Sequence, residues 1–280
     1  MANFIKTTRS PGRRWRLLVA ALALLVPAAT AWAAPRPVVL ELFTSNGCSS
    51  CPPAYALLSD LRENPPADDI ELILLNQHVD YWDNLGWVDP FSGAKYTDRQ
   101  RGYARNVFGS GRVYTPQLVV DGQREMVGSR RGEVTAAIKA QADAANLPVT
   151  LNIARDGARA VTATVDLGGN ARDGAVQVWL AMTQDDVVTQ VGGGENGGRS
   201  LHEDGVVHQL VPAQVVAGQQ RYSAQLSLPS RAPVASLAVV AFVQRVPSRA
   251  IVGATRTPLS QTSLSLKASP TQQELASIVH

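Results

Sequence analysis

The chain has 280 residues with a formal net charge of +3, and only two of these residues are cysteines. Because 45% of the residues are hydrophobic and 18% are charged, the composition predicts a folded core and excludes an intrinsically disordered chain. Two cysteines also exclude a disulfide-dense small protein, a four-cysteine zinc site and a cubane iron–sulfur site.

Residues 1–33 have the three parts of a secretory signal peptide. Five basic residues and no acidic ones precede an apolar run over 17–26, and Ala31-Trp32-Ala33 forms a small-residue cleavage site. The run of about ten residues is shorter than the ~20 that a transmembrane helix needs. We therefore expect cleavage, with an uncleaved membrane anchor as the alternative.

Removal of this signal peptide changes the charge of the protein. The chain has 26 Lys and Arg against 23 Asp and Glu, so loss of the five basic residues leaves 21 against 23. A slightly acidic mature chain predicts no nucleic-acid partner, and without residues 1–33 we expect no stable membrane span. The expected location is periplasmic or secreted, where disulfides form and persist.

From residue 34 to 147 the sequence alternates between strand and helix patterns. Residues 38–43 and 70–75 are nearly apolar on both faces, which is typical of buried strands in an α/β sheet. Between them, apolar residues at i, i+3, i+4 and i+7 predict a helix whose first turn contains two prolines. The Cys48 and Cys51 pair, in the pattern C-x-x-C, therefore lies at a helix N-terminus.

The next part, residues 78–113, predicts an aromatic-rich insertion with one helix. A strand over 117–121, a short returning strand over 125–127 and a closing helix from Val134 complete the first domain. Three aromatic residues of the insertion could line a groove beside the cysteines or pack the insertion onto the sheet: Tyr81, Trp82 and Trp87.

From residue 148 the hydrophobic periodicity changes to two. Apolar residues alternate in runs that begin at Val149, Val161 and Val176, and Asp156-Gly157 is a strong hairpin signal between the first two. Successive short strands of this kind predict an antiparallel, all-β, sandwich-like second domain over 148–280.

The cysteine pair is the strongest chemical signal. Unpaired N–H groups and the dipole at a helix N-terminus stabilise a thiolate at Cys48. A lowered pKa makes this sulfur a populated nucleophile and a good leaving group in thiol–disulfide exchange, and Cys51, one turn on, would resolve the mixed disulfide. The alternative is a permanent local disulfide, which stabilises little because its loop is short.

Several segments resemble a bacterial secreted thioredoxin-like family known as domain of unknown function 1223: ELFTSNGCSSCPPA, NQHVDYWDNLGW, DPFSGAKYTDRQRGYA, VYTPQLVVDG and GGGENGGRSL. The resemblance implies an α/β thioredoxin-like fold with an insertion over 34–147. It also implies that Pro116 is cis and lies against the dithiol, and that Thr115 pairs its backbone with the substrate.

The same resemblance implies a role for Glu41, seven residues before Cys48. It resembles the buried acid with which thioredoxins move the proton of the resolving cysteine. A one-residue offset would turn the side chain to the opposite face of the sheet, so an exposed carboxylate with an ordinary pKa is the alternative.

The favoured function is an exported thiol–disulfide oxidoreductase without a cofactor, whose partners are protein or small-molecule thiols and disulfides of the cell envelope. One alternative is a metal-binding or metal-delivery protein that holds copper with Cys48, Cys51 and His78, because these ligand types suit copper or zinc. Another alternative is a non-enzymatic thioredoxin-like scaffold that docks an envelope partner.

Two further motifs are weaker. Residues 193–200 read G-x-x-x-x-G-R-S, which lacks the lysine of a phosphate-binding loop, and we interpret them as a glycine-rich turn. His202, Glu203 and His208 do not form H-E-x-x-H, although on a strand the two histidines would share a face and could form a surface metal site with Asp204.

Overall fold

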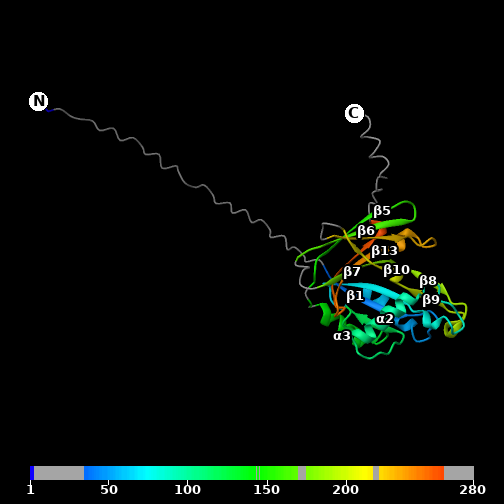
Figure 1. Cartoon of the computed structure of the whole chain (residues 1–280). Coiled ribbons are helices and arrows are strands. Elements are labelled where there is room, and N and C mark those ends of the chain that lie inside the picture. Colours follow the sequence, from blue (N-terminus) through cyan, green and yellow to red (C-terminus); the bar gives the residue numbers. More distant parts are fainter. Residues whose placement is uncertain (3–34, 143, 145, 170–174, 217–220, 262–280) are drawn as a thin grey trace, which may run out of the picture. The chain divides into compact units, whose positions relative to one another are not determined.

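The computed structural model describes residues 1–2, 35–142, 144, 146–169, 175–216 and 221–261 (Figure 1). The chain divides into two units, Met1–Ala33 and Ala34–His280, and the fold below is that of the second. Apart from its first two residues, the predicted signal peptide lies outside the described residues. Within the described ranges, no helix has the length and apolar character needed to cross a membrane.

The described residues of the first half form four strands and three α-helices. In chain order these are β1 (Arg36–Thr44), α1 (Pro52–Glu63), β2 (Ile70–His78), a 3-10 turn η1 (Asp80–Trp82), α2 (Ala94–Asn106), β3 (Gln117–Val120), β4 (Arg124–Val127) and α3 (Arg131–Ala142). Strand β1 pairs in parallel with β2 and antiparallel with β3. The predicted elements of this half are confirmed, with shifted ends.

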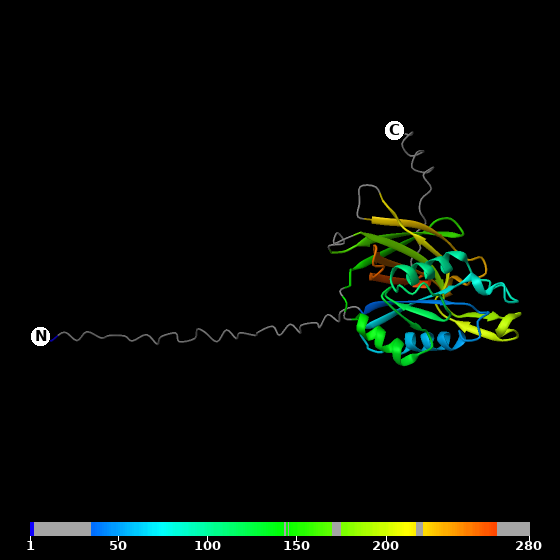
Figure 2. The ribbon, with the colours of Figure 1, turned by 60° about the horizontal axis from the view of Figure 1, so that its bottom comes forward.

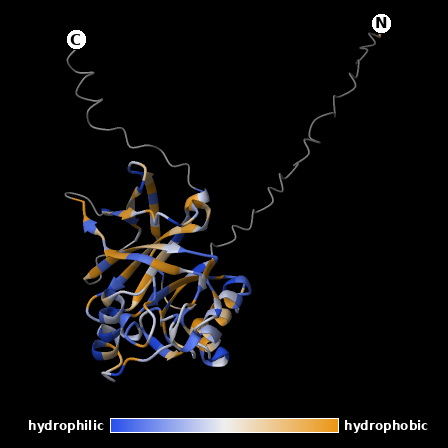
Figure 3. Ribbon diagram, turned by 90° about the vertical axis from the view of Figure 1, so that its right-hand side faces the viewer, coloured by the Kyte–Doolittle hydropathy of each residue, from blue (hydrophilic) through white to orange (hydrophobic). Residues whose placement is uncertain are grey.

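The described residues of the second half are mainly strands. They are β5 (Val149–Arg155), β6 (Ala160–Leu167), β7 (Val176–Gln184), β8 (Val187–Gln190), η2 (Gly194–Asn196), β9 (Ser200–Glu203), β10 (Val206–Pro212), β11 (Gln214–Val215), β12 (Arg221–Ser227), η3 (Val234–Ser236), β13 (Leu237–Arg245), β14 (Ile251–Pro258) and η4 (Leu259–Gln261). Hydrophobic residues run along many of the strands of the molecule (Figure 3).

The predicted fold class, an α/β thioredoxin-like fold followed by a sandwich-like all-β domain, is wrong. The two halves share one mixed eight-stranded sheet in the order β14-β13-β7-β10-β2-β1-β3-β4. The junction is the pairing of β10 with β2, where Val206 lies opposite Asn76. A strand edge with unpaired N–H and C=O groups accepts any suitable strand, and β10 completes this edge of β2 from far along the chain. Local periodicity does not encode that partner.

A second, four-stranded sheet has the order β11-β12-β6-β5. Its inner residues, such as Val161 and Leu226, share an apolar core with Leu180 and Val239 of the large sheet. Strands of the second half therefore both extend the first sheet and cover part of it, so the protein is mostly β rather than α/β.

The helices cover both faces of the first-half strands, with α1 and α3 on one side and α2 on the other (Figure 2). Because strand side chains alternate, Leu40 and Leu42 of β1 pack with α1 and α3, while Phe43 packs against α2 residues. Both cysteines belong to the core on the α1 side.

Candidate functional site

The cysteines lie on the loop that joins β1 to α1. Strand β1 ends at Thr44, and Cys51 is the N-cap residue of α1, whose first turn begins with Pro52. Proline is suited to this position because its missing N–H would have no partner in the helix. Cys48 and Cys51 are free thiols, and each is 0% exposed.

Two hydroxyl groups contact the sulfur of Cys48, and an indole N–H contacts one of these hydroxyls. The Thr115 hydroxyl donates a hydrogen bond to Cys48 Sγ at 3.3 Å, and Ser50 Oγ lies 3.2 Å from the same sulfur. Trp82 Nε1 donates to Thr115 Oγ1 at 2.9 Å. Because that hydroxyl oxygen already accepts from the indole, its own proton is free to point at the sulfur.

The pKa values of the two thiols are shifted in opposite directions. Hydrogen bonds from Cys51, and then from Ser50 and Thr115, outweigh the effect of burial and lower the pKa of Cys48 to about 6. Burial raises the pKa of Cys51, and the hydrogen bond and charge of Cys48 raise it further. At neutral pH the pair therefore holds one thiolate and one thiol.

The predicted Thr-Pro element is brought to this pair. The Thr115–Pro116 peptide bond is cis, as expected from the resemblance. Ser50 Oγ also lies 3.4 Å from the carbonyl oxygen of Thr115, which places the cysteine loop beside the residue before the proline. The structure thus places Cys48, Cys51, Thr115 and Pro116 together.

Glu41 is not brought to the dithiol. It lies on the other face of β1, where it accepts hydrogen bonds from Arg99 Nη2 at 2.9 Å, from Gln77 Nε2 at 2.7 Å and from the Tyr103 hydroxyl. Burial would raise the pKa of Glu41, but the charge and hydrogen bonds of Arg99 hold it below its usual value. The alternation of side chains along β1 accounts for this placement.

His78 is buried between two acids rather than aimed at the cysteines as a ligand. Its Nδ1 lies 2.8 Å from Asp89 Oδ2, and its Nε2 lies 3.2 Å from Glu203 Oε2. Burial alone would lower the pKa of His78, but Asp89 and Glu203 raise it to about 10. Both ring nitrogens face carboxylates, so the structure does not assemble the predicted copper ligands.

A segment from the second half, residues 191–199, contacts the cysteine loop and was not predicted as part of the site. Asn196, which is buried, donates from Nδ2 to the carbonyls of Asn46 at 2.9 Å and Cys48 at 2.8 Å. Glu195 Oε2 accepts from the backbone N–H of Ser49 at 2.9 Å and from its hydroxyl at 2.7 Å. The glycine-rich turn was predicted, but nothing local to it indicates this contact.

A family model described as a protein of unknown function, DUF1223, matches residues 39–244. The chain belongs to this family. The matched range contains all the site residues named above, including the segment 191–199 of the second half.

Two solved structures resemble this DUF1223 protein over most of its length. A protein from Agrobacterium tumefaciens is 27% identical, with a TM-score of 0.61, and the match covers 85% of this chain and 100% of that one. HBP35 of Porphyromonas gingivalis is 14% identical, with a TM-score of 0.58 over 85% of this chain and 79% of that one, which shows similarity of fold alone. Among curated proteins nothing matches.

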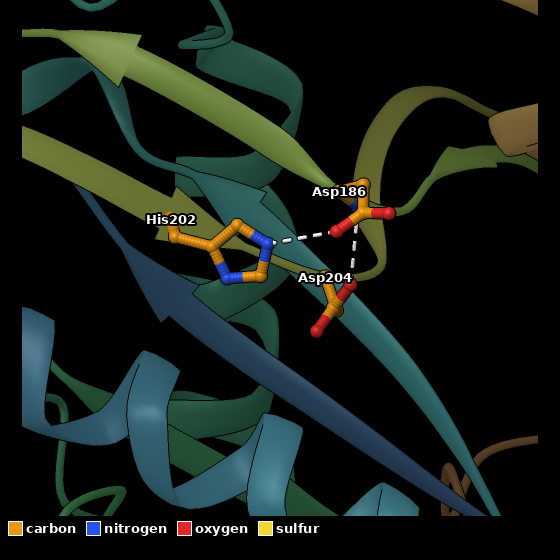
Figure 4. Close-up of side chains that lie close together, drawn as sticks. All are labelled: Asp186, His202 and Asp204. Atoms are coloured by element: carbon orange, nitrogen blue, oxygen red, sulfur yellow. Dashed lines mark hydrogen bonds and ion pairs between the residues drawn. The ribbon is translucent and has the colours of Figure 1, made fainter.

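The DUF1223 chain carries a second cluster of potential ligands at the surface, formed by Asp186, His202 and Asp204 (Figure 4). His202 Nε2 lies 3.0 Å from Asp186 Oδ1. Asp204, however, is already paired with Arg62 at 3.1 Å and accepts from Ser59 Oγ at 2.6 Å. The guanidinium supplies the charge that a cation would otherwise provide.

The predicted partnership of His202 with His208 is not formed. His208 lies on β10, where its Nε2 is 2.9 Å from Gln184 Oε1. His202 lies on β9 and contacts Asp186 instead. The chain turns between the two strands, so the assumption of one continuous strand fails.

Proposed function

We propose that this protein is a thiol–disulfide oxidoreductase that acts on protein or small-molecule thiols and disulfides. The observation that carries the proposal is the asymmetry of the pair: both sulfurs are buried, but Cys48 Sγ lies against the hydroxyls of Thr115 and Ser50, and the pKa of Cys48 is lowered while that of Cys51 is raised. A thiolate next to hydrogen-bond donors is a good nucleophile and a good leaving group.

The proposed reaction has two steps. The Cys48 thiolate attacks a substrate disulfide, forms a mixed disulfide and releases one substrate thiolate. Cys51 then loses its proton and attacks the Cys48 sulfur, which releases the second substrate thiolate and leaves a Cys48–Cys51 disulfide. The substrate gains two electrons and the dithiol loses two; the reverse sequence oxidises a substrate dithiol.

A substrate can reach Cys48 only if the residues that cover it, Trp82 and the segment 191–199, move. The residue is 0% exposed, Trp82 belongs to the apolar core around it, and the segment 191–199 is bonded to its loop. The bonds from Ser49 to Glu195 are at the surface, where hydrogen bonds are weak because water competes for both partners. We propose that this cover moves aside when a disulfide substrate binds.

Variants of the two cysteines test the proposal. Cys48→Ser should abolish reduction of a model aromatic disulfide, and Cys51→Ser should accumulate a mixed disulfide at Cys48 that mass spectrometry detects. Alkylation of Cys48 should have its midpoint near pH 6, the pKa given by its contacts, rather than near the ordinary value of about 8.5. Full turnover by Cys48→Ser would overturn the proposal.

Thr115→Val isolates the hydroxyl contact with the sulfur. Loss of a hydrogen bond to a charged group costs about 1.5–3 kcal/mol, so the alkylation midpoint should rise by roughly one to two pH units. Thr162→Val is the matched control, because Thr162 Oγ1 donates to Asp156 at 2.9 Å in the second sheet. An unchanged midpoint in Thr115→Val would remove Thr115 from the proposed mechanism.

We also propose that the protein works in the periplasm or outside the cell. The support is the signal-peptide pattern of residues 1–33. Expression of the full chain in a bacterial host should yield an exported protein whose first residue is Ala34. A cytoplasmic product that keeps Met1 would contradict this location.

A further inference from the structure

A cavity of about 310 Å³ lies where the end of α2 meets strands β7 and β13 and the turn between β13 and β14. This volume is at the lower end of the range of small-molecule sites, which begins at about 300 Å³. Arg245 and Arg249 line the cavity, and none of the described residues that line it is acidic. Trp179, Val246 and Pro247 give it apolar walls. The lining is therefore both cationic and partly apolar.

The cavity is separate from the proposed redox site. Its wall residue Trp179 lies 5.0 Å, from ring centroid to Cζ, below the guanidinium of Arg99. Arg99 pairs with Glu41 on the α2 face of the sheet, whereas both cysteines belong to the core on the α1 side. A ligand in this cavity would therefore be a different molecule from the disulfide substrate, and the inference goes beyond the proposed function.

The backbone of Arg249 is held in a conformation that costs energy for an arginine. Its φ is +60°, in the left-handed region that glycine adopts without steric cost. Two hydrogen bonds fix it there: its N–H donates to the carbonyl of Arg245 at 2.9 Å, and its own carbonyl accepts from Gln244 Nε2 at 2.8 Å. Strained residues of this kind are typical of functional sites, and here the strained residue places a guanidinium at a cavity.

The guanidinium of Arg249 is positioned by packing. A Cβ added to Gly102, in the interior of α2, would lie 2.6 Å from Arg249 Nη2, so the guanidinium occupies the space that a side chain would need. Glycine is unfavourable inside a helix, and this contact gives a reason for its presence. The guanidinium also lies over the ring of Tyr103, with Cζ 5.3 Å from the centroid. Among the described residues Arg249 forms no ion pair, so its charge is available to an anion.

Trp179 supplies a second polar feature. Its ring stacks with that of Phe242 at 6.4 Å between centroids and an interplanar angle of 16°, which fixes the indole. Its Nε1 is buried, and among the described residues no group accepts its hydrogen bond. Buried donors are normally paired, because an unpaired donor loses its hydrogen bonds to water without replacement. An oxygen atom of a bound ligand would supply the acceptor.

We propose that this cavity binds a small organic carboxylate. The carboxylate pairs with the guanidinium of Arg249, whose planar array of N–H groups matches two carboxylate oxygens. The body of the ligand lies against the apolar walls formed by Trp179 and Val246. These walls favour an organic acid over an inorganic anion, because contact with them removes apolar surface of the ligand from water.

Calorimetric titration of the chain without residues 1–33 tests the proposal, with benzoate as the probe. Benzamide has the same shape without the charge, so benzoate should bind at least about 10-fold more tightly, as expected for a hydrogen-bonded charge pair. Arg249→Gly removes the guanidinium, and glycine adopts the same backbone without strain. This variant should bind benzoate about as weakly as benzamide. Inorganic phosphate should bind more weakly than benzoate, because it makes no use of the apolar walls.

Gly102→Ala keeps the charge of Arg249 but takes the space of its guanidinium, so it should also weaken the binding of benzoate. Gly132→Ala is the matched control, because an added Cβ there, in α3, has open space. It should leave the affinity unchanged. No binding of millimolar benzoate, equal binding of benzamide or phosphate, or unchanged affinity in Arg249→Gly would overturn the proposal. The comparison of benzoate with benzamide in the unmodified protein decides the matter even if a variant does not fold.

Discussion

Glu41 and Glu203 are both fully buried acids, and two adjacent residues of β2 contact them: Gln77 contacts Glu41, and His78 contacts Glu203. Gln77 points to the α2 face and donates to Glu41, whereas His78 points to the α1 side and pairs with Glu203. The carboxylate of Glu41 accepts hydrogen bonds from Arg99, Gln77 and Tyr103. That of Glu203 has the ring of His78 as its ion-pair partner, with Nε2 3.2 Å from Oε2.

The two acids differ in the cation that each faces and in whether that cation keeps another partner when the acid is removed. A carboxylate whose lone pairs are all used, and which pairs with a guanidinium, has no capacity to take a proton at neutral pH. Sequence reasoning gave a proton-handling role to Glu41, whereas the structure places its carboxylate with Arg99, Gln77 and Tyr103, on the face of β1 away from the dithiol.

The largest expected effect is on stability. Glu41→Gln leaves Arg99 buried with its charge unpaired and should lower the free energy of unfolding by about 3–5 kcal/mol. Glu203→Gln removes one of the two acids beside His78 and leaves His78 paired with Asp89, so the change should be no more than about 1 kcal/mol in either direction. Chemical unfolding of both variants and the unmodified protein measures this. Equal losses of unfolding free energy in the two variants would mean that the two acids contribute equally to stability.

The second largest expected effect is on the pH dependence of stability, which should differ between the pair of His78 with Glu203 and the pair of Arg99 with Glu41. The folded pKa of His78, about 10, lies above its unfolded value of about 6.5. Its stabilisation is therefore fully present below pH ~6.5 and is lost as the pH rises through about 10. The pKa of Glu41 is lowered, so its stabilisation is lost as the pH falls.

Comparison with His78→Gln isolates the alkaline effect, since other groups also titrate there. The unmodified protein should lose more stability than this variant between pH 7 and pH 10, and both should respond alike to acid. An imidazole of His78 that titrates near pH 6.5 by NMR would contradict the assignment.

Local patterns predicted much of the first half and the core of the site. Helical spacing placed Cys48 and Cys51 at the start of α1, and the resemblance brought Thr115 and Pro116 to them. These predictions held because each depends on residues close together in the sequence, or on a motif that recurs as a unit.

The errors have a common physical cause in contacts between distant parts of the chain. The pairing of β10 with β2 through Val206 depends on an edge that any strand could occupy. Asn196 and Glu203 reach the cysteine loop or its neighbours from about 150 residues away, as the 148-residue separation of Asn196 and Cys48 illustrates. The prediction for Glu41 was wrong for a different reason: the face of the sheet to which its side chain points changes with a one-residue shift in register.

The smallest expected effect is at the cluster of Asp186, His202 and Asp204, in which Asp186 and His202 are exposed and Asp204 is buried. Asp186 and His202 have 87% and 50% of their side-chain surface exposed, and exposed ion pairs add little to stability. Asp186→Asn should therefore leave the unfolding midpoint unchanged, and added zinc should shift neither protein, because Arg62 already pairs with Asp204. A zinc-dependent rise in the midpoint of the unmodified protein alone would show that the cation displaces Arg62, and exposure would then be a poor guide to which of these acids is free to act.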